Sequence, residues 1–163
     1  MADPAKTLEI QVHSTAVAVG KMRNEIEVYA KFGKDVRFNL PTDEGEFHGG
    51  ESTAPPPLAY FCAGLTGCFM TQVRAFAKKL RVPLDGLKVE GSYHWRAHLQ
   101  DNAPYVGAPV AFDLDIEIDS PAPVEDIVKL VQAAKEGCFI EQTMRTANSI
   151  GHRVTLRGET LEM

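Results

Sequence analysis

Three cysteines, Cys62, Cys68 and Cys138, are the side chains of this sequence with the clearest capacity for chemistry. A thiolate is a nucleophile, and two thiols that meet can cycle between a dithiol and a disulfide. Cys62 and Cys68 lie in a segment whose apolar residues recur at the spacing of an amphipathic helix. On a helical wheel Cys62 falls within the apolar stripe and Cys68 falls on its flank. We therefore expect Cys62 to be a small core residue and Cys68 to face a neighbouring element or a ligand.

Two glycines, Gly64 and Gly67, lie on the same flank of this predicted helix as Cys68. Each costs roughly 1 kcal/mol relative to alanine in a helix interior. That cost is usually tolerated where another helix, a partner chain or a substrate must approach the helix closely. The glycines therefore predict a close approach beside Cys68, and periodicity alone favours tight packing and a binding site equally.

Cys138 directly follows Gly137, where one helix is predicted to end and another to begin. Unpaired N–H groups and the positive end of the helix dipole favour a thiolate at such a position. A purely structural role for a cysteine at a helix cap is equally consistent with the sequence. Two flank-positioned thiols on different helices, 70 residues apart, are nevertheless the minimum that a dithiol–disulfide cycle requires.

Around these cysteines the sequence predicts alternating strands and three helices. The first three strands have connections too short for crossovers, so we expect them to pair antiparallel, with a turn at 33–35. The long helix is opened by Pro55-Pro56-Pro57, and the second follows Asp119-Ser120-Pro121 and stops at Gly137. Strands are expected at residues 8–13, 25–30, 36–40, 87–97, 110–118 and 152–156. Helices are expected at 58–80, in a segment that ends at 137, and in a short segment that begins at 138. This order predicts one α+β domain over residues 1–163.

Composition excludes several classes of protein. The 163 residues carry a formal net charge of −5, which disfavours the binding of nucleic acid, whose phosphates need a positive protein face. No apolar stretch approaches the roughly 20 residues of a membrane span, and the first residues lack the layout of a secretory signal. An odd number of cysteines favours free thiols in a reducing compartment, so we expect a cytoplasmic protein. His94 and His98 are too far apart on one strand to chelate a single metal ion.

Two helical segments resemble those of a known family. The first is the run ESTAPPPLAYFCAGLTGCFMTQVRAFAKKL, which is similar to the central helix of the OsmC/Ohr superfamily (osmotically inducible protein C and organic hydroperoxide resistance proteins). There a proline-containing turn leads into a helix of small residues that carries a cysteine. The second is SPAPVEDIVKLVQAAKEGCFIEQTM, which resembles the helical region with the other cysteine of that family. The strands LKVEGSYHWRAHL and APVAFDLDIEIDS between them also fit, so the resemblance covers essentially the whole chain.

The resemblance implies an OsmC-like α+β fold with antiparallel sheets, a long central helix and an intertwined homodimer that has two active sites at its interface. In catalytic members the first cysteine attacks an organic hydroperoxide and becomes a sulfenic acid. The second cysteine then forms a disulfide, which an external dithiol reductant opens. By position, the peroxidatic cysteine is Cys68 and the resolving cysteine is Cys138, and Cys62 matches no functional cysteine. Neither a metal nor a bound cofactor is implied.

One feature of the catalytic members is missing. They carry a glutamate shortly after the proline, which holds an arginine against the reactive sulfur, and Leu58 or Ala59 stands at that place here. Without a nearby cation, a thiol buried in mid-helix keeps a raised pKa and stays inert. We therefore hypothesise that other charged residues stabilise the Cys68 thiolate. The candidates are Arg23 and Arg37 in the early strands, His48 in the preceding loop, and Glu51, which would pair with one of them.

Two functions follow from these observations. Retention of both cysteines favours thiol-dependent reduction of organic hydroperoxides at a dimer interface, as part of an oxidative stress response. The missing glutamate favours an OsmC-like dimeric binding module for an apolar ligand, without peroxidase activity. Rapid loss of two thiols on mixing with an organic hydroperoxide would distinguish the first function from the second.

Overall fold

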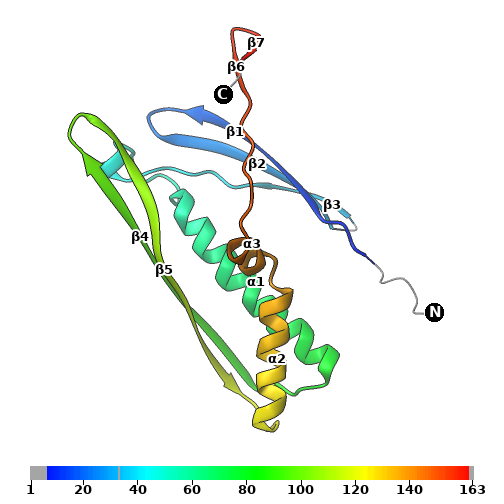
Figure 1. Ribbon diagram of the computed structural model, residues 1–163. Helices are drawn as coiled ribbons and strands as arrows, with labels where there is room; N and C mark the ends of the chain where they lie inside the picture. The colour runs from blue at the N-terminus through cyan, green and yellow to red at the C-terminus, as the bar shows by residue number, and fades with distance from the viewer. Residues whose placement is uncertain (1–6, 33, 162–163) are drawn as a thin grey trace. The chain divides into compact units, whose positions relative to one another are not determined.

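The structure, a computed structural model, describes residues 7–32 and 34–161. The chain divides into two compact units, Met1–Phe61 and Cys62–Met163. Three strands are followed by a long helix, two long strands, two further helices and a short hairpin (Figure 1). All strand pairs are antiparallel, so the predicted α+β class with antiparallel sheets is confirmed. The single domain over 1–163 stays a prediction.

The first unit contains a three-stranded sheet in the order β1 (Gln11–Val19), β2 (Arg23–Phe32) and β3 (Lys34–Asn39). Every residue of β1 and β3 is exposed. A sheet normally packs at least one of its faces, the apolar one, against another layer of the protein. This sheet therefore presents apolar side chains at its surface, among them Val17 and Phe38, which are 59% and 50% exposed.

The first strand begins later and ends later than predicted. The predicted bounds 8–13 are wrong, because β1 starts at Gln11 and Leu8 is 81% exposed. Its second half includes residues 16–19, which are apolar at every position and so lack the alternation on which the prediction rested. Of the predicted 33–35 turn, Gly33 lies outside the described residues, and Lys34 and Asp35 belong to β3.

The second unit is built on a long hairpin and three helices (Figure 1). Strands β4 and β5 pair along almost their whole length, with register shifts after His94 and after His98. The shorter β6 and β7 form a separate hairpin near the end of the chain. The elements are α1 (Pro57–Leu80), whose first residues belong to the first unit, β4 (Gly86–Gln100), β5 (Ala103–Asp119), α2 (Val124–Gly137), α3 (Phe139–Arg145), β6 (Val154–Leu156) and β7 (Glu159–Leu161).

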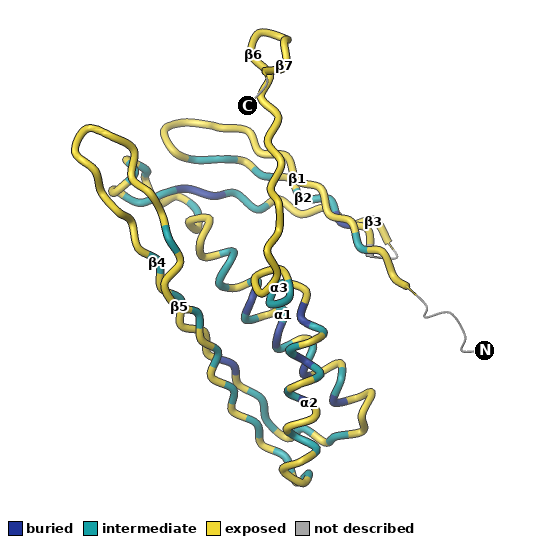
Figure 2. Tube along the Cα trace, in the orientation of Figure 1, coloured by how far each residue is buried: buried dark blue, intermediate teal, exposed yellow. Residues whose placement is uncertain are grey.

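The core of the second unit lies between α1, α2 and the β4–β5 hairpin. Along α1 the buried residues Leu65, Phe69 and Val73 recur every fourth position, which places them on one face of the helix. Figure 2 shows buried positions along α1 and α2, whereas the β6–β7 hairpin is exposed throughout. The buried cluster consists of Leu65, Phe69, Val73, Ala77, Val89, Leu130, Ala134 and Cys138.

Three details of the second unit differ from the sequence-based expectations. The second helix begins at Val124, after Pro123, and not at the Asp119-Ser120-Pro121 signal. The predicted final strand at 152–156 is shorter, and its partner β7 was not predicted because three residues are too few to show a period. Cys62 is half-buried and lies outside the buried cluster, because the buried part of the α1 stripe begins only at Leu65. The prediction that Cys62 is a core residue is therefore wrong.

Among the described residues, no helix has both the length and the apolarity needed to cross a bilayer.

Candidate active site around two cysteines

Cys138 lies at the junction between α2 and α3, where it caps the N-terminus of α3. Its side chain is fully buried. Its Sγ accepts a hydrogen bond from the backbone N–H of Glu141 at 3.5 Å, and its carbonyl oxygen accepts one from the N–H of Gln142 at 2.9 Å. These contacts fix the thiol at the start of the short helix, as the sequence predicted.

The glycine before Cys138 explains how this junction reaches α1. A Cβ atom at Gly137 would lie only 2.5 Å from Cε2 of Phe76. Because real Cβ atoms do not approach other atoms so closely, any larger residue would force the Phe76 ring or the junction to move. Gly137 therefore sets the close packing of the α2 C-terminus on α1 and brings Cys138 into the core.

Cys68 is half-buried on α1 and packs against the cluster that contains Cys138. The two glycines near it have different surroundings. A Cβ at Gly64 would lie 3.3 Å from Cδ1 of Ile140, so this glycine serves the close packing of α3 on α1. A Cβ at Gly67 would meet no atom within 4 Å. Packing thus accounts for Gly64, and the space beside Gly67, next to Cys68, is open within the described residues.

The electrostatics of Cys138 include an interaction with Cys68. Its pKa is raised from 9.0 to about 11, chiefly because burial disfavours the charged thiolate. The backbone N–H groups of Glu141 and Ile140 lower the pKa, whereas a side-chain hydrogen bond with Cys68 and the charge of Cys68 raise it further. The N–H groups at the helix start do favour the thiolate, as expected, but desolvation outweighs them. Cys138 stays protonated at neutral pH and can donate its S–H hydrogen bond to Cys68.

A tyrosine that the sequence analysis did not single out is hydrogen-bonded to α1 close to Cys68. The Tyr93 hydroxyl lies 2.6 Å from Oγ1 of Thr66 and donates to the carbonyl oxygen of Cys62 at 3.2 Å. Its ring packs with Trp95 and Phe112, at centroid distances of 6.2 and 6.1 Å. No sequence signal indicated the partner of Tyr93 on α1.

A cavity of about 540 Å³ opens between α1, β5, α2 and α3. Leu65, Phe69 and Phe112 are among its apolar lining residues, and Glu141 and Arg145 contribute charged groups. The Glu141 carboxylate lies 3.9 Å from Nη1 of Arg145, and the backbone N–H of Glu141 is the donor to Cys138. The cavity therefore borders the helix that positions the buried thiol. Its volume lies within the usual range of small-molecule sites.

The four charged candidates for stabilising the Cys68 thiolate all lie in the first unit. The ion pairs they form there are Arg23 with Glu25 at 2.8 Å, Arg37 with Glu27 at 2.6 Å, His48 with Glu44 at 3.3 Å and Glu51 with Lys21 at 3.0 Å. Glu51 thus forms an ion pair with Lys21, a residue that was not among the sequence-based candidates. A role for any of the four beside Cys68 stays a prediction.

Arg23 has the most elaborate surroundings of these four. Its Nη1 donates to the carbonyl oxygen of Thr53 at 3.1 Å and to the Thr53 hydroxyl at 2.9 Å. Thr53 in turn donates its N–H and its hydroxyl to Oδ2 of Asp43, at 2.9 and 2.7 Å. Hydrogen bonds from Thr53 and from the N–H of Glu44 lower the pKa of Asp43, a buried carboxylate that sequence reasoning missed.

The loop that carries His48 is organised by backbone contacts. It contains the short 3₁₀ helix η1 (Glu46–His48), which Gly49 ends in a left-handed conformation with φ of 76°. A Cβ at Gly50 would overlap the carbonyl oxygen of Glu44, so only glycine fits there. The two glycines therefore shape the turn.

Within residues 7–32 and 34–161, no group of three or more His, Cys, Asp or Glu side chains is arranged to hold a metal ion.

The model of the family described as OsmC-like protein matches residues 49–153, which include both Cys68 and Cys138. The chain belongs to the OsmC-like family. An OsmC-like hydroperoxide resistance protein from Jannaschia sp. CCS1 is 45% identical to this OsmC-like chain, with 92% of this chain and 95% of the other covered and a TM-score of 0.63. No curated protein matches the chain significantly.

More distant structures share the fold of this OsmC-like protein. The organic hydroperoxide resistance protein OsmC of Legionella pneumophila is 21% identical, with 86% of this chain and 92% of the other covered and a TM-score of 0.60. An organic hydroperoxide resistance protein of Elizabethkingia anophelis is 17% identical, with coverages of 86% and 91% and a TM-score of 0.58.

Proposed function

We propose that this OsmC-like protein reduces organic hydroperoxides with two cysteines, Cys68 as the attacking thiolate and Cys138 as the resolving thiol. The observation that carries the proposal is the interaction between the two sulfurs, which come from helices far apart in the sequence. The names of the related proteins, which describe hydroperoxide resistance, support the same general role.

The cycle consumes one hydroperoxide and yields one alcohol and one water. The Cys68 thiolate attacks the terminal oxygen of ROOH, so that an S–O bond forms, the O–O bond breaks and the alkoxide leaves and takes up a proton. The Cys138 sulfur then attacks the Cys68 sulfenic acid, which forms the disulfide. The departing hydroxide combines with the Cys138 proton to give water. An external dithiol, such as a reduced dithiol protein or cofactor, returns the disulfide to two thiols by exchange.

The position and exposure of the two thiols support this assignment of roles. Cys68 is half-buried, and the space beside the adjacent Gly67 is open, which supports access of a small hydroperoxide from that side. Cys138 is fully buried and is kept protonated by its raised pKa, which is about 11. A buried neutral thiol is protected from direct oxidation and is available once the sulfenic acid forms beside it.

The proposal includes a homodimer in a reducing compartment such as the cytoplasm. Every residue of β1 and β3 is exposed, and large apolar side chains on the sheet, among them Val12, Val17 and Phe38, are at least half exposed. Monomeric proteins rarely leave so much apolar sheet surface uncovered, so a second copy is the partner we propose. Arg23, Arg37, His48 and Glu51 remain the candidate charges for the Cys68 thiolate. We infer no metal and no tightly bound cofactor.

Thiol counting during reaction with cumene hydroperoxide tests the proposal. The reduced protein is expected to lose two thiols per chain rapidly, and Cys68→Ser is expected to abolish that loss. Cys138→Ser is expected to lose one thiol and to accumulate a sulfenic acid that a dimedone probe traps. Cys62→Ser is the matched control, because this third thiol lies outside the buried cluster. Thiol loss no faster than that of free cysteine would contradict the proposal.

A second candidate function rests on the cavity between α1, β5, α2 and α3. Its lining is mainly apolar, and the family glutamate is replaced by Leu58 or Ala59. A dimeric module that holds an apolar ligand would use such a cavity without peroxidase chemistry. Native mass spectrometry that detects a retained apolar molecule, together with slow thiol loss, would favour this function over the first.

A further inference from the structure

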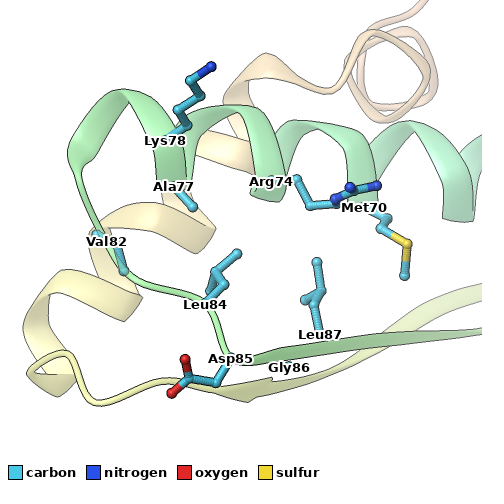
Figure 3. A pocket seen from close by; sticks show the side chains of 9 residues that line it. All are labelled: Met70, Arg74, Ala77, Lys78, Val82, Leu84, Asp85, Gly86 and Leu87. Atoms are coloured by element: carbon cyan, nitrogen blue, oxygen red, sulfur yellow. The ribbon is translucent and has the colours of Figure 1, made fainter.

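A second cavity, also of about 540 Å³, lies at the C-terminal end of α1 (Figure 3). It is formed by α1, the loop that follows α1, and the start of β4. None of the three cysteines lines it. This cavity is therefore separate from the candidate active site and needs its own explanation.

Hydrogen bonds hold the loop wall of this cavity in place. The N–H of Val82 donates to the carbonyl oxygen of Ala77 at 2.9 Å, which closes the end of the helix. The Ser120 hydroxyl donates to the carbonyl oxygen of Pro83 at 2.6 Å. The N–H of Asp85 donates to the carbonyl oxygen of Asp119 at 2.9 Å. Because both ends of the loop are anchored, the cavity is part of the fold and does not depend on a ligand to form it.

The floor of the cavity is apolar, and the core holds its side chains in place. Its apolar side chains belong to the core cluster or pack against it, so the core itself fixes them. In Figure 3, Leu84 and Leu87 point toward α1 from the loop and the strand. The apolar lining residues are Met70, Ala77, Val82, Leu84 and Leu87. An alkyl chain placed over them would be shielded from water on the side that faces this floor.

An unpaired arginine lies over this apolar floor. Arg74 and Lys78 are one helical turn apart on α1, and in the described part of the chain neither forms an ion pair. The helix dipole accounts for Lys78 in the last turn, but Arg74 lies before that turn. Figure 3 shows the Arg74 side chain extended along the cavity, the Lys78 amine directed away, and Asp85 at the opposite side.

We propose that this cavity binds an aliphatic monocarboxylate. The carboxylate pairs with the planar guanidinium of Arg74, which presents two parallel N–H groups to it. The alkyl chain lies along the apolar floor, and Lys78 adds positive potential one turn away. Asp85 disfavours a second carboxylate at the far end of the chain, so a monocarboxylate binds better than a dicarboxylate. This site is independent of the cysteine cycle.

Isothermal titration calorimetry of the full reduced chain with octanoate tests the site. We expect saturable binding with a Kd below about 1 mM. Arg74→Gln is expected to weaken binding at least about tenfold, which corresponds to about 1.4 kcal/mol. Lys79→Gln is the matched control, because Lys79 is an exposed cation on the same helix that does not line the cavity. Octanedioate is expected to bind more weakly than octanoate, and Asp85→Asn to reduce that difference.

Two further measurements keep the outcome unambiguous. Methyl resonances of Leu84 and Leu87 are expected to shift with octanoate, and Cys68→Ser is expected to leave the affinity unchanged. Equal binding of octanoate and 1-octanol, or an unchanged affinity in Arg74→Gln, would overturn the proposal. So would the absence of saturable binding. None of these results would affect the hydroperoxide assay, because that assay depends on Cys68 and Cys138.

Discussion

Raising the pH from 8 to 11 is expected to destabilise the protein through Cys138. Its folded-state pKa is about 11, against 9.0 for an ordinary thiol, because the folded protein buries the sulfur. Between these values the unfolded chain has lost the thiol proton and the folded chain still holds it. The folded state therefore binds more protons than the unfolded state, and the free energy of unfolding falls as the pH rises through this window.

The expected size follows from the shift of the pKa. The difference between 9.0 and about 11 is roughly two pKa units. At 1.36 kcal/mol per unit, Cys138 removes about 2 to 3 kcal/mol of stability between pH 9 and pH 11. Below pH 9 both states are protonated, and this contribution is fully present. A loss of this size is a substantial part of the 5–15 kcal/mol that typically stabilises a domain.

Urea unfolding of the fully reduced protein at pH 8, 9, 10 and 11 measures this effect. Tyr29 and Lys88 also have raised pKa values, through hydrogen bonds to Asp35 and to Glu90 respectively, and they contribute to any alkaline loss. Both are present in Cys138→Ala, so the difference in stability between the two proteins isolates the thiol. We expect the advantage of the wild type over Cys138→Ala to shrink as the pH rises. A difference that is constant from pH 8 to pH 11 would refute the reasoning.

Three further predictions concern other contacts. Gly137→Ala is expected to destabilise the protein by about 1 to 3 kcal/mol in urea unfolding, because the added Cβ would meet the Phe76 ring. Gly67→Ala is the control: its added Cβ has open space, so we expect it to stabilise the protein by up to about 1 kcal/mol. Tyr93→Phe is expected to cost about 1 kcal/mol of stability by removing a hydroxyl that contacts α1, and unchanged stability would contradict that role. Hydrogen bonds from Thr53 lower the pKa of Asp43, and the stability that this adds is lost as the pH falls below 3.8. In acid unfolding, Asp43→Asn is therefore expected to lose less free energy of unfolding over that range than the wild type.

The elements with strong periodicity could be predicted from the sequence. The apolar residues of α1 recur so regularly that its predicted bounds, 58–80, differ by one residue from the observed Pro57–Leu80. The strands β4 and β5 alternate cleanly and were found, although both extend further than predicted. β1 was misplaced and β7 was missed, because the first is apolar at consecutive positions and the second is too short to show a period.

The site residues stay a prediction, and the electrostatics of Cys138 could be predicted only in part. Helical spacing misjudged Cys62, which lies outside the buried cluster, whereas the glycine before Cys138 correctly marked the helix junction. The sequence could not show that Cys138 is fully buried, since burial depends on how α2 and α3 pack on α1. It therefore predicted the sign of the local N–H effect on the thiol correctly and missed the larger effect of desolvation.

Burial, more than the helix start, distinguishes the roles that we propose for the two thiols. Attack on a sulfenic acid releases hydroxide, which leaves more easily if a proton is delivered to it. A resolving thiol that is protonated when the sulfenic acid forms can supply that proton directly, so a pKa of about 11 is compatible with the second step. The same pKa would make Cys138 a poor first nucleophile, because the thiolate is the reactive form. The order of attack in the proposed cycle, Cys68 before Cys138, therefore follows from the buried position of the second sulfur.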